Sequence, residues 1–599
     1  MRLLRIQECA LALLALIGLE DALKAQNKQV QRPNVIVVIT DDQGYGDFSC
    51  HGNPVLQTPA LDRLYSEGVR FTDFHVAPLC TPTRGQLMTG MHALNNKAAT
   101  VGTGRDMIRT DLTLMPEVFR RNGYRTGIFG KWHLGDNHPH RPMDRGFTKS
   151  VWTKGWGLLS EAEFDNDYYR TRYLDSLEVK QTDRYCTDLW FDEAMEWMGE
   201  SVSRGVPFFT YLATNTPHGP LLAPEADLAH FRAKGLDERT SQFLGMVRNI
   251  DRNMERLERF LAGKGILDNT VLLFLTDNGG TGGVDVFNAG MRGMKGGYYE
   301  GGHRGAWLMR WPNGPLPKGF TVKEPCEVQD VLPTLVDMLR LKTTSMQAFD
   351  GRSAMPLIND REKGIKDRML VVQYGGNHRP VKLAACVIWK SWRLVGRDEL
   401  YDISTDPGQT ANVADRHPEV RRRMLDFYER WWKGKEASIE RFVPIAAGTD
   451  FEDTLILTSN FWADSAYVNT QWKVANAVGP KDGGIWHIDV KRGGRYRIEL
   501  SRWPFHLSRD LTTAGPSLSV GGSPLREGRA LKIETGCVSI DGGEPKQSRK
   551  DRHDSDRIVM EADMKAGPAS LRAWFRDAQG RDLCGAYYLR LTRIGGSNP

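Results

Sequence analysis

Short, unbroken runs of apolar residues alternate with amphipathic stretches from residue 34 onward. The four clearest runs cover residues 35–39, 127–129, 207–213 and 271–275. Runs this short and this uniformly apolar are typical of strands that are buried on both faces. The pattern therefore predicts an α/β fold, with a mostly parallel sheet flanked by helices.

The stretches between these runs contain the signals of helices. Thr58-Pro59 begins a predicted helix that Gly68 ends, because proline favours the first turn of a helix. Apolar residues from Phe243 to Leu261 recur at helical spacing and give that stretch a one-sided apolar face. A last helix is predicted to begin near Pro418 and to end at Trp432. Together, these elements place a first domain at residues 32–435.

The pattern changes after a link at residues 433–448. Residues 486–490 alternate between apolar and polar, and residues 496–500 do the same after a turn at Arg492-Gly493-Gly494. A period of two on both sides of a turn predicts a β-hairpin. Further short apolar runs favour a C-terminal all-β, sandwich-like domain at residues 449–599.

The start of the chain has the pattern of a secretory signal peptide over residues 1–25. Arg2 and Arg5 precede an apolar run at residues 10–19, and Ala25 is a small residue at which cleavage can occur. The apolar run is too short to span a bilayer. No Asn-x-Ser/Thr glycosylation acceptor occurs in the chain, which favours a bacterial source. We therefore expect an exported protein, periplasmic or secreted, with no membrane span after the signal is removed.

Length and composition set the broad class. A chain of 599 residues exceeds what one core supports, so two or more domains are expected. With 40% hydrophobic and 26% charged residues, the composition is that of a folded globular protein rather than a disordered or membrane-embedded one. The net charge of +6 is small, and we expect no nucleic-acid partner. The function therefore has to be inferred from motifs.

The chain contains eight cysteines, and two of them stand apart. Cys9 falls within the predicted signal peptide, and Cys80 lies in a motif that is described below. The others are Cys50, Cys186, Cys326, Cys386, Cys537 and Cys584. They could form disulfides in an oxidising compartment, but buried thiols are expected for most of them.

Polar residues closely follow each of the four apolar runs. These residues are Asp41-Asp42 after the first run, Lys131 and His133 after the second, His218 after the third and Asp277-Asn278 after the fourth. In an open α/β sheet, the loops at the carboxyl ends of the strands converge on one site. We therefore expect these side chains to lie together.

Two of these groups form an all-oxygen donor set. Asp41 and Asp42 cannot both be buried as anions without a cation, and Asp277-Asn278 adds a third carboxylate and an amide oxygen. Such donors suit a hard divalent ion such as calcium. Each pair alone could be a turn or a helix cap, but the two pairs at two strand ends favour a metal site.

The most specific motif is Cys80-Thr81-Pro82-Thr83-Arg84-Gly85. From the composition, a Cys-x-Pro-x-Arg match is expected about 0.05 times by coincidence. Pro82 suits the first turn of a helix, so residue 80 is expected at a helix N-terminus, where unpaired N–H groups attract anions. A plain thiol at a turn is the alternative.

Together these residues resemble the type I sulfatases, which are arylsulfatase-like members of the alkaline phosphatase superfamily. The resemblance extends from Asn34 to about Trp432. The motifs, in order, are Asn34-Val-Ile-Val-Val-Ile-Thr-Asp-Asp42, residues 80–90, Gly130-Lys-Trp-His-Leu-Gly135, Pro217-His218, Asp277-Asn278-Gly279, Lys295-Gly296 and Glu300-Gly301-Gly302. One departure is Gly305-Ala306, where the family often has Val-Pro, and it puts no catalytic role in doubt.

The resemblance implies the hydrolysis of sulfate esters by a formylglycine, which a separate maturation enzyme makes from Cys80. In the family, the hydrated aldehyde of this residue attacks sulfur and then expels sulfate. Arg84 and Lys131 are expected to position that group, and His133 to remove its proton. One calcium ion is expected at Asp41, Asp42, Asp277 and Asn278.

The resemblance also implies how substrate is held. His218 and Lys295 are expected to contact the sulfate, with His218 as the proton donor to the leaving alcohol. Sulfated carbohydrates are the expected substrates, since an exported enzyme would meet them. Other candidate contacts are Met291, Arg292, Tyr298 and Tyr299, in the glycine-rich run at residues 279–302, which could equally be a structural loop.

Two other functions stay open on the sequence alone. A phosphonate or phosphodiester hydrolase of the same superfamily can share formylglycine and a similar metal site. In a catalytically inactive glycan-binding protein, Cys80 would remain a thiol. For the β-rich domain we favour a structural or accessory role over carbohydrate binding, because tryptophans are more often buried than exposed as sugar platforms. The candidate platforms are Trp462, Trp472, Trp486, Trp503 and Trp574.

Overall fold

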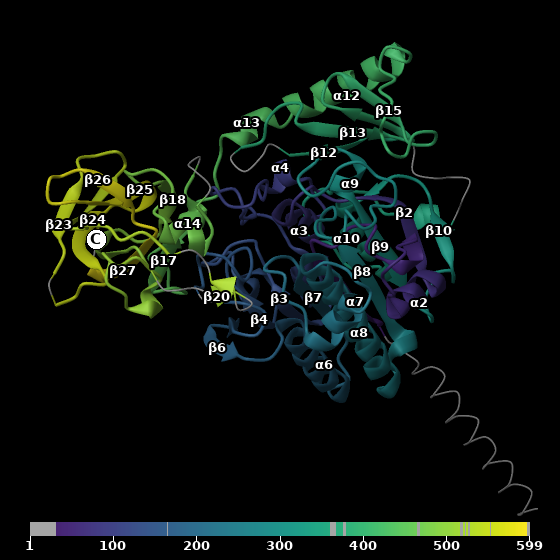
Figure 1. Cartoon of the computed structure of the whole chain (residues 1–599), viewed down its shortest axis with the longest axis horizontal. Coiled ribbons are helices and arrows are strands. Elements are labelled where there is room, and N and C mark those ends of the chain that lie inside the picture. The colour runs from purple at the N-terminus through teal and green to yellow at the C-terminus, as the bar shows by residue number, and fades with distance from the viewer. Residues whose placement is uncertain are drawn as a thin grey trace, which may run out of the picture.

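The structure is a computed structural model, and it describes most of the chain from residue 32 onward. The described ranges are 32–164, 166–344, 346–359, 367–374, 379–463, 468–515, 519–520, 523–524, 527–551 and 553–595. The predicted signal peptide lies outside the described residues. Figure 1 shows an α/β core, a small sheet with a long helix above it, and a β-rich domain at the left.

An 11-stranded sheet forms the centre of the α/β core. The four predicted runs are strands β1 (Asn34–Asp41), β3 (Arg125–Lys131), β7 (Phe208–Pro217) and β8 (Thr270–Thr276). They lie side by side in the order β8-β1-β7-β3, and every neighbouring pair is parallel. The prediction of a mostly parallel sheet is confirmed.

The sheet continues on both sides of these four strands. Beyond β3 lie β4 (Lys149–Thr153), β5 (Thr171–Asp175) and β6 (Glu178–Thr182); β4 pairs in parallel with β3, whereas the β4–β5 and β5–β6 pairs are antiparallel. Beyond β8 lie antiparallel β9 (Arg304–Arg310) and then β2 (Val69–His75), which pairs in parallel with β10 (Phe320–Val322) and β11 (Cys326–Glu327).

Alternate side chains of β1 enter hydrophobic cores on opposite faces of the sheet. Val37 packs into a core that contains residues of α3 (Cys80–Thr89), α5 (Met115–Arg121) and α10 (Val331–Leu339). Val38 packs into a core with α2 (Pro59–Glu67), α6 (Cys186–Ser203) and α8 (Glu238–Gly263). Burial on both faces explains why the strand is apolar throughout. The predicted helices at 58–68 and 243–261 are α2 and α8.

Short elements connect these layers. They are α4 (Ala93–Asn96), α7 (Glu225–Arg232), α9 (Glu300–His303), α11 (Met355–Asn359), α13 (Glu436–Ile439) and 3-10 turns such as η4 (Val328–Asp330). Among the described residues, no helix combines the length and the apolar character needed to cross a membrane.

A small antiparallel sheet lies against the α/β core. It consists of β12 (Leu370–Gln373), β13 (Ala385–Trp389), β14 (Trp392–Val395) and β15 (Glu399–Asp402). The predicted last helix, α12 (Pro418–Lys433), packs along it (Figure 1). The sequence pattern did not reveal this sheet, because its strands are only four or five residues long.

Two sheets share one hydrophobic core in the C-terminal domain. The first contains β16 (Ile445–Ala447), β18 (Ile485–Val490), β22 (Thr535–Ile540), β23 (Lys546–Arg549), β25 (Gly567–Arg576) and β26 (Asp582–Gly585). The second contains β17 (Thr454–Thr458), β19 (Gly494–Ser501), β24 (Ile558–Met564) and β27 (Tyr588–Gly595). A short helix, α14 (Gln471–Ala475), and the pair β20 (Ser519–Val520) and β21 (Ser523–Pro524) complete it. The prediction of a C-terminal β-rich, sandwich-like region is confirmed.

The predicted hairpin within this domain is wrong. β18 pairs with β16 and β25, whereas β19, which follows it after a tight turn, pairs with β24 and β27. Ile488 of β18 and Ile498 of β19 both enter the shared core, from opposite sheets. A chain that crosses from one sheet to the other shows the same period of two as a hairpin, so the pattern alone does not separate them.

The cysteines and tryptophans match the expected buried roles. Cys50 is half-buried and the other described cysteines are buried, all as free thiols. Four of the five candidate tryptophans, Trp462, Trp486, Trp503 and Trp574, are buried, and only Trp472 is well exposed, at 42%. The four buried tryptophans therefore serve the core of the β-rich domain rather than a flat binding face.

The β-rich domain packs on a loop of the α/β core that follows β4. Thr458 Oγ1 donates a hydrogen bond to Glu161 Oε1 at 2.6 Å, and the Tyr588 hydroxyl donates to the Glu161 carbonyl at 2.6 Å. The indole Nε1 of Trp156 donates to the Asn469 carbonyl at 2.5 Å. These buried contacts fix the two domains against each other close to the carboxyl ends of the central strands.

Candidate active site

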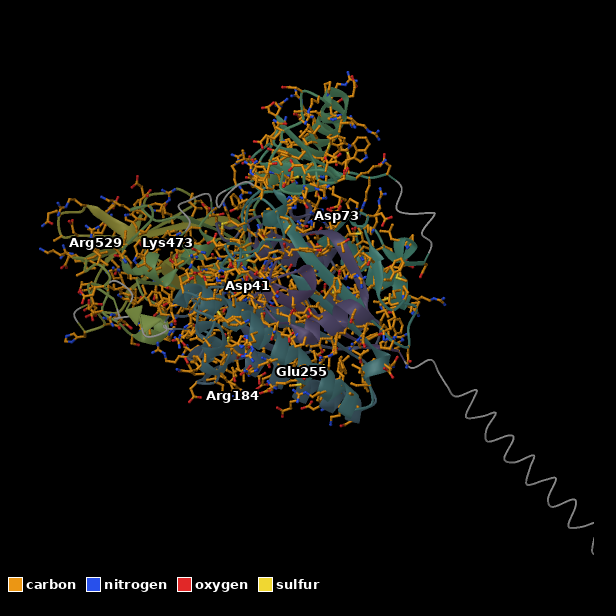
Figure 2. The ribbon with its side chains drawn as sticks, turned by 45° about the vertical axis from the view of Figure 1, so that its right-hand side comes forward. Asp41, Asp73, Arg184, Glu255, Lys473 and Arg529 are labelled. Carbon is orange, nitrogen blue, oxygen red and sulfur yellow. The ribbon has the colours of Figure 1, made fainter. Side chains whose placement is uncertain are left out.

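Strand register brings the predicted polar residues together. β1 and β7 pair so that Asp41 lies opposite Pro217, which places His218 next to Asp42. β1 and β8 pair with Thr40 opposite Thr276, so Asp277 follows immediately beside Asp41. Figure 2 shows Asp41 near the centre of the molecule, away from surface residues such as Arg184. The expected convergence of strand ends is present.

Cys80 is the first residue of α3, at the position that Pro82 predicted. It is 3% exposed, and its Sγ and carboxylate oxygens of Asp41 and Asp277 lie within 4.8 Å of one another. Burial raises the pKa of the Cys80 thiol, although Lys131 and Lys295 act against this shift. Because the thiolate is the reactive form of cysteine, an unmodified Cys80 is a weak nucleophile at neutral pH.

Two buried ion pairs flank the cysteine. Lys131 Nζ lies 2.7 Å from Asp41 Oδ2, and Arg84 Nη2 lies 2.9 Å from Asp277 Oδ2. Arg84 also donates to the Lys131 carbonyl at 3.3 Å, which ties α3 to the end of β3. Burial alone would raise the pKa of Asp41, but Lys131 and other nearby cations hold it well below its usual range. Burial, reinforced by Asp41, raises the pKa of Asp277 to about 7.

Asp42 lies where β1 ends and the chain turns sharply. Its φ of 74° is in the left-handed region, which is uncommon for a residue other than glycine and costs backbone strain. In this conformation its amide donates to Asp277 Oδ1 at 3.1 Å, and its carboxylate accepts from Asn278 Nδ2 at 3.0 Å and from Lys295. Asp42, Asp277 and Asn278 thus form one hydrogen-bonded group, and Asp41 precedes Asp42 at the end of β1.

This donor set fits a hard cation. Asp41 Oδ1 and Asn278 Oδ1 are buried and have no hydrogen-bond partner among the described atoms. Leaving a buried polar atom unpaired costs about 1–3 kcal/mol, so each needs a partner that the protein does not provide. Calcium binds carboxylate and amide oxygens of this kind.

His133 also has a left-handed backbone, with φ at 60°, and it is buried next to α3. Its Nε2 lies 2.8 Å from Thr81 Oγ1, so α3 orients the ring. Burial and the charges of Lys131 and Arg84 lower the pKa of His133 well below its usual value. A neutral imidazole results, which is the form that can accept a proton.

His218 is held differently. Its Nδ1 donates to the Gly219 carbonyl at 2.7 Å, and its Nε2 lies 3.7 Å from Asp42 Oδ2. Because Nδ1 bears the proton of the neutral ring, Nε2 can donate only when the ring is an imidazolium. Burial lowers the pKa of His218, whereas Asp42 acts in the opposite direction.

Lys295 reaches the site from the glycine-rich loop between β8 and α9. The amide of Gly296 donates to the Pro78 carbonyl at 2.9 Å, which ties this loop to the segment before Cys80. Gly279 allows the loop to approach, since a Cβ there would lie 2.0 Å from the Gly301 carbonyl oxygen. The side chains of His218 and Lys295 keep 22% and 17% of their exposure, so solvent reaches the site from their side.

Sequence reasoning missed three residues around Cys80. Thr81 was seen only as part of the motif, and its contact with His133 depends on the fold. Trp156 and Tyr374 pack in one cluster with Cys80, and the Trp156 ring lies 5.1 Å from that of His218. Neither belongs to a local motif, because Trp156 follows β4 and Tyr374 follows β12, the first strand of the small sheet that was not predicted.

Of the other candidate contacts in the glycine-rich run, one packs beside Cys80 and the others do not. Tyr298 packs against the Cys80 cluster, and its hydroxyl donates to the Tyr374 carbonyl at 3.2 Å. Arg292 instead stacks on Tyr299 and donates to the Tyr401 hydroxyl, which is a structural contact with β15. Met291 is half-buried.

A family model described as Sulfatase matches residues 33–341, which is more than half of the chain and includes all of the site residues predicted from the sequence. The chain belongs to the sulfatase family. It is therefore a sulfuric ester hydrolase by family, with the alkaline-phosphatase-like fold.

Relatives of this sulfatase include enzymes and solved structures. N-acetylgalactosamine-6-sulfatase of Rattus norvegicus is 27% identical over 490 residues, which cover 76% of this chain and 88% of the relative. The structure of Ps i-CgsB in complex with k-i-k-neocarrahexaose is 27% identical, covers 67% of this chain and 93% of that chain, and has a TM-score of 0.61. A phosphonate monoester hydrolase of Agrobacterium radiobacter, at 20% identity and a TM-score of 0.50, covers 68% of this chain and 96% of that one. At that identity the likeness shows the fold alone.

Proposed function

We propose that this sulfatase hydrolyses sulfate esters on carbohydrates, with a formylglycine made from Cys80 as its nucleophile. The observation that supports this most is the placement of Cys80. It begins a fully buried helix, its thiol is kept protonated, and its Sγ lies among the carboxylates of Asp41 and Asp277. A buried cysteine with a raised pKa is poorly suited to attack sulfur as a thiol, so modification of the residue accounts for the site better.

The carbohydrate part of the proposal has support from two relatives. The rat enzyme is named for a sulfated sugar, N-acetylgalactosamine 6-sulfate, and Ps i-CgsB was solved with a neocarrahexaose. Both cover two thirds or more of this chain. We propose the same class of substrate here, with sulfate and the desulfated alcohol as products.

Formylglycine supplies a hydrated aldehyde, of which one hydroxyl attacks sulfur and the other loses its proton when the aldehyde re-forms. The chain's own residues orient this group and move the protons. His133 is neutral and buried beside α3, so it is placed to accept the second hydroxyl's proton. Arg84 and Lys131 hold the surrounding carboxylates in place through their ion pairs.

His218 and Lys295 lie on the side of the site that solvent reaches. Lys295 can place its ammonium group against sulfate oxygens, where charge develops as the S–O bond breaks. His218 can protonate the leaving alcohol from Nε2, since its Nδ1 is already engaged with Gly219. The two histidines would therefore act on different protons.

Asp41, Asp42, Asp277 and Asn278 would hold one calcium ion, because two of their oxygens are buried without a partner. Bound calcium would polarise the sulfate oxygens. We also propose that a maturation enzyme acts on Cys80 before or during folding, since the residue is 3% exposed afterwards. Export to the periplasm or the medium is a proposal that rests on residues 1–25 alone.

The experiment is a pair of measurements on purified full-length protein. The mass of the peptide containing residue 80 distinguishes formylglycine from cysteine. Parallel assays with an aryl sulfate, N-acetylgalactosamine 6-sulfate, an aryl phosphate and a phosphonate ester then compare the reactions. Faster turnover of phosphorus esters would overturn the proposal in favour of a phosphonate or phosphodiester hydrolase. An unmodified Cys80 with no turnover would favour the inactive glycan-binding protein.

A further inference from the structure

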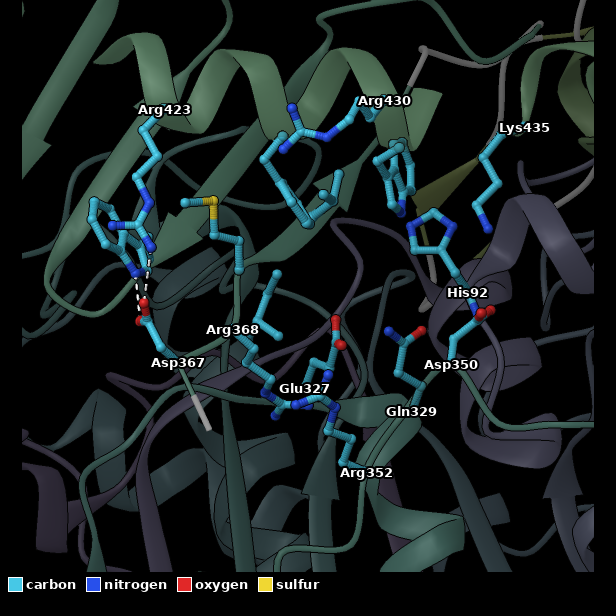
Figure 3. A pocket seen from close by; sticks show the side chains of 16 residues that line it. His92, Glu327, Gln329, Asp350, Arg352, Asp367, Arg368, Arg423, Arg430 and Lys435 are labelled. Carbon is cyan, nitrogen blue, oxygen red and sulfur yellow. Dashed lines mark hydrogen bonds and ion pairs between the residues drawn. The ribbon is translucent and has the colours of Figure 1, made fainter. Parts of the chain in front are cut away.

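A cavity of about 450 Å³, separate from the candidate active site, lies between the α/β core and the small antiparallel sheet. Its floor comes from η4 and the loop at residues 350–352, and its roof comes from α12. Figure 3 shows side chains from both sides pointing into the space. None of the residues assigned to the reaction lines it.

The cavity is well separated from Cys80. Cys80 begins α3, whereas the lining residue His92 follows Gly90, which ends that helix. Ten helical residues span about 15 Å at a rise of 1.5 Å each. Strand β12 also separates the cavity from Cys80. Leu370 at the start of the strand lines the cavity, whereas Tyr374, after its end, packs in the Cys80 cluster. A ligand here would not touch the nucleophile.

The charges around the cavity are unbalanced. Arg368 pairs with the buried carboxylate of Asp330, and Arg423 pairs with Asp367, so these two arginines are neutralised. Arg352 and Arg430 also line the cavity, and no ion pair joins either side chain to a carboxylate among the described residues.

Two further residues, Lys435 and Glu327, also make the net charge around the cavity more positive. Lys435 lines the cavity near His92 (Figure 3). Burial and the charge of Asp330 raise the pKa of Glu327 to about 8, so its carboxyl group is largely neutral at pH 7. Asp350 remains as one acidic group. The unpaired charge that faces the cavity is therefore positive, which favours an anionic ligand.

The floor also offers a hydrogen-bond acceptor. Gln329 is 4% exposed, and its Oε1 is buried without a hydrogen-bond partner among the described atoms. An amide oxygen can only accept a hydrogen bond, so it calls for a hydroxyl or N–H on the ligand. Inorganic sulfate at neutral pH has no proton to donate. A ligand that satisfies Gln329 must therefore carry a hydroxyl or N–H in addition to its negative charge.

Aromatic side chains form part of the wall on the side of α12. Trp431 and Phe427 on this helix and Trp389 at the end of β13 line the cavity and are only half-buried. The ring of His92 meets Trp431 edge-on, with centroids 4.9 Å apart, and so fixes the orientation of the indole. Flat apolar faces of this kind suit the C–H faces of sugar rings.

We propose that this cavity binds a sulfated sugar unit, with its sulfate near Arg352 and Arg430, its hydroxyls toward Gln329 and its ring against Trp431. The choice of a sulfated sugar over another hydroxyl-bearing anion rests on the proposed function. Because the cavity lies far from Cys80, it would hold a non-reacting unit of a glycan and raise the enzyme's affinity for sulfated glycans.

The test uses full-length protein with Cys80→Ala, which binds without turnover. Calorimetric titration with N-acetylgalactosamine 6-sulfate should show two binding events. Arg430→Gln and, from the opposite wall, Arg352→Gln should each weaken one event by about tenfold or more, the loss expected for a charge-assisted hydrogen bond. Arg422→Gln is the matched control, because it lies on the same helix, pairs with Glu419 and does not line the cavity. It should leave both events unchanged.

Two further ligands show whether the sulfate group, the sugar ring or both are needed for binding to the cavity. Inorganic sulfate and uncharged N-acetylgalactosamine should each bind this cavity at least about tenfold more weakly than the sulfated sugar. Equal binding of inorganic sulfate would overturn the proposal in favour of a simple oxyanion site. The absence of any binding event that both arginine variants weaken would also overturn it.

Turnover separates this inference from the proposed function. With Cys80 intact, Arg430→Gln should hydrolyse an aryl sulfate within about twofold of the parent rate, since the site chemistry is unchanged. If the parent enzyme hydrolyses sulfate esters but the cavity binds no sulfated sugar, only the inference about the cavity is contradicted. A protein that binds the sugar here but hydrolyses no sulfate ester contradicts only the proposed function.

Discussion

Arg84 Nη2 lies 2.9 Å from Asp277 Oδ2, and neither side chain has any exposed surface. Such a pair gains little net stability, because removing two charges from water offsets most of their attraction. It does make each partner depend on the other. Since Arg84 lies on α3 and Asp277 follows the end of β8, the pair also fixes the helix that begins at Cys80 against the proposed metal site.

Removing one partner should therefore be costly. We expect Asp277→Ala to lower the free energy of unfolding by about 3–5 kcal/mol, because the Arg84 guanidinium is then left buried without a counter-charge. Urea unfolding measures the change. Asp268→Ala is the control, since Asp268 is exposed in the turn before the same strand, and it should change stability by less than about 0.5 kcal/mol. Equal effects of the two substitutions would show that the pair does not matter.

Calcium removal should lower activity and thermal stability together. Without a cation, Asp41, Asp42 and Asp277 face one another, and Asp41 Oδ1 and Asn278 Oδ1 lack a partner. A ligand that binds only the folded state raises the unfolding midpoint, so added calcium should restore both quantities. Metal analysis before and after chelation serves as the control. A protein proved metal-free that keeps its rate and midpoint would show that these residues form only structural turns.

Cys80→Ala should abolish turnover and preserve the fold. The position is buried at the start of α3 and should accept a small side chain, whereas the proposed reaction needs the modified residue. Activity at even about a tenth of the parent rate, a barrier change of only about 1.4 kcal/mol, would refute the nucleophile assignment. Cys386→Ala is a suitable comparison, because Cys386 is also buried but lies on β13, so it should remain active.

The sequence predicted the central strands well because their burial on both faces leaves a strong signal. Val35 and its neighbours on β1 are apolar without interruption, and polar residues begin only where the strand ends. Parallel pairing then forces those ends together, so the positions of Asp41, His218 and Asp277 follow from topology. For this reason the site could be assembled from the sequence.

Other features depend on contacts between distant segments and left no local pattern. Trp156 is oriented by the Asn469 carbonyl of the β-rich domain, some 313 residues away along the chain. β18 and β19 look like a hairpin because each has one apolar face, and only the pairing of other strands shows that they belong to different sheets. Periodicity gives the face that a strand buries, but it does not identify the partner strand.

Glu161, at the contact between the domains, should make stability depend on pH. Burial, reinforced by Asp136 and Asp106, raises the pKa of Glu161 to about 8, from an ordinary value of 4.5. Between these values the folded state holds a proton that the unfolded state has lost. Stability should therefore fall as pH rises from about 5 to 8, by up to ~1.4 kcal/mol per pH unit from this group.

Glu161→Gln isolates that contribution. The amide keeps the shape and can still accept from Thr458 Oγ1, which bonds Glu161 Oε1 at 2.6 Å, but it does not titrate. The variant's unfolding midpoint should fall less than that of the parent between pH 5 and pH 8, and the two curves should approach each other at the acid end. Parallel curves across this range would show that Glu161 is not protonated in the folded protein.

The two histidines of the site differ in what holds them. His133 is anchored to α3 by Thr81 and is neutral, whereas His218 is anchored by the Gly219 carbonyl and has its Nε2 toward Asp42. His133 is 3% exposed, but the His218 side chain keeps 22% of its exposure. The buried His133 ring is thus suited to accept a proton from residue 80. The accessible His218 ring is suited to donate a proton to the leaving alcohol of the substrate.

Replacing His133 with alanine should therefore slow the release of sulfate more than the attack on sulfur. Brief exposure of His133→Ala to an aryl sulfate should leave added sulfate mass on the peptide that contains residue 80, and mass spectrometry can measure it. His218→Ala is the matched control, because losing the proton donor to the alcohol slows the first step and should leave no such mass. If His133→Ala is slow but never shows the added mass, while His218→Ala does, then the roles of the two histidines are the reverse of those proposed.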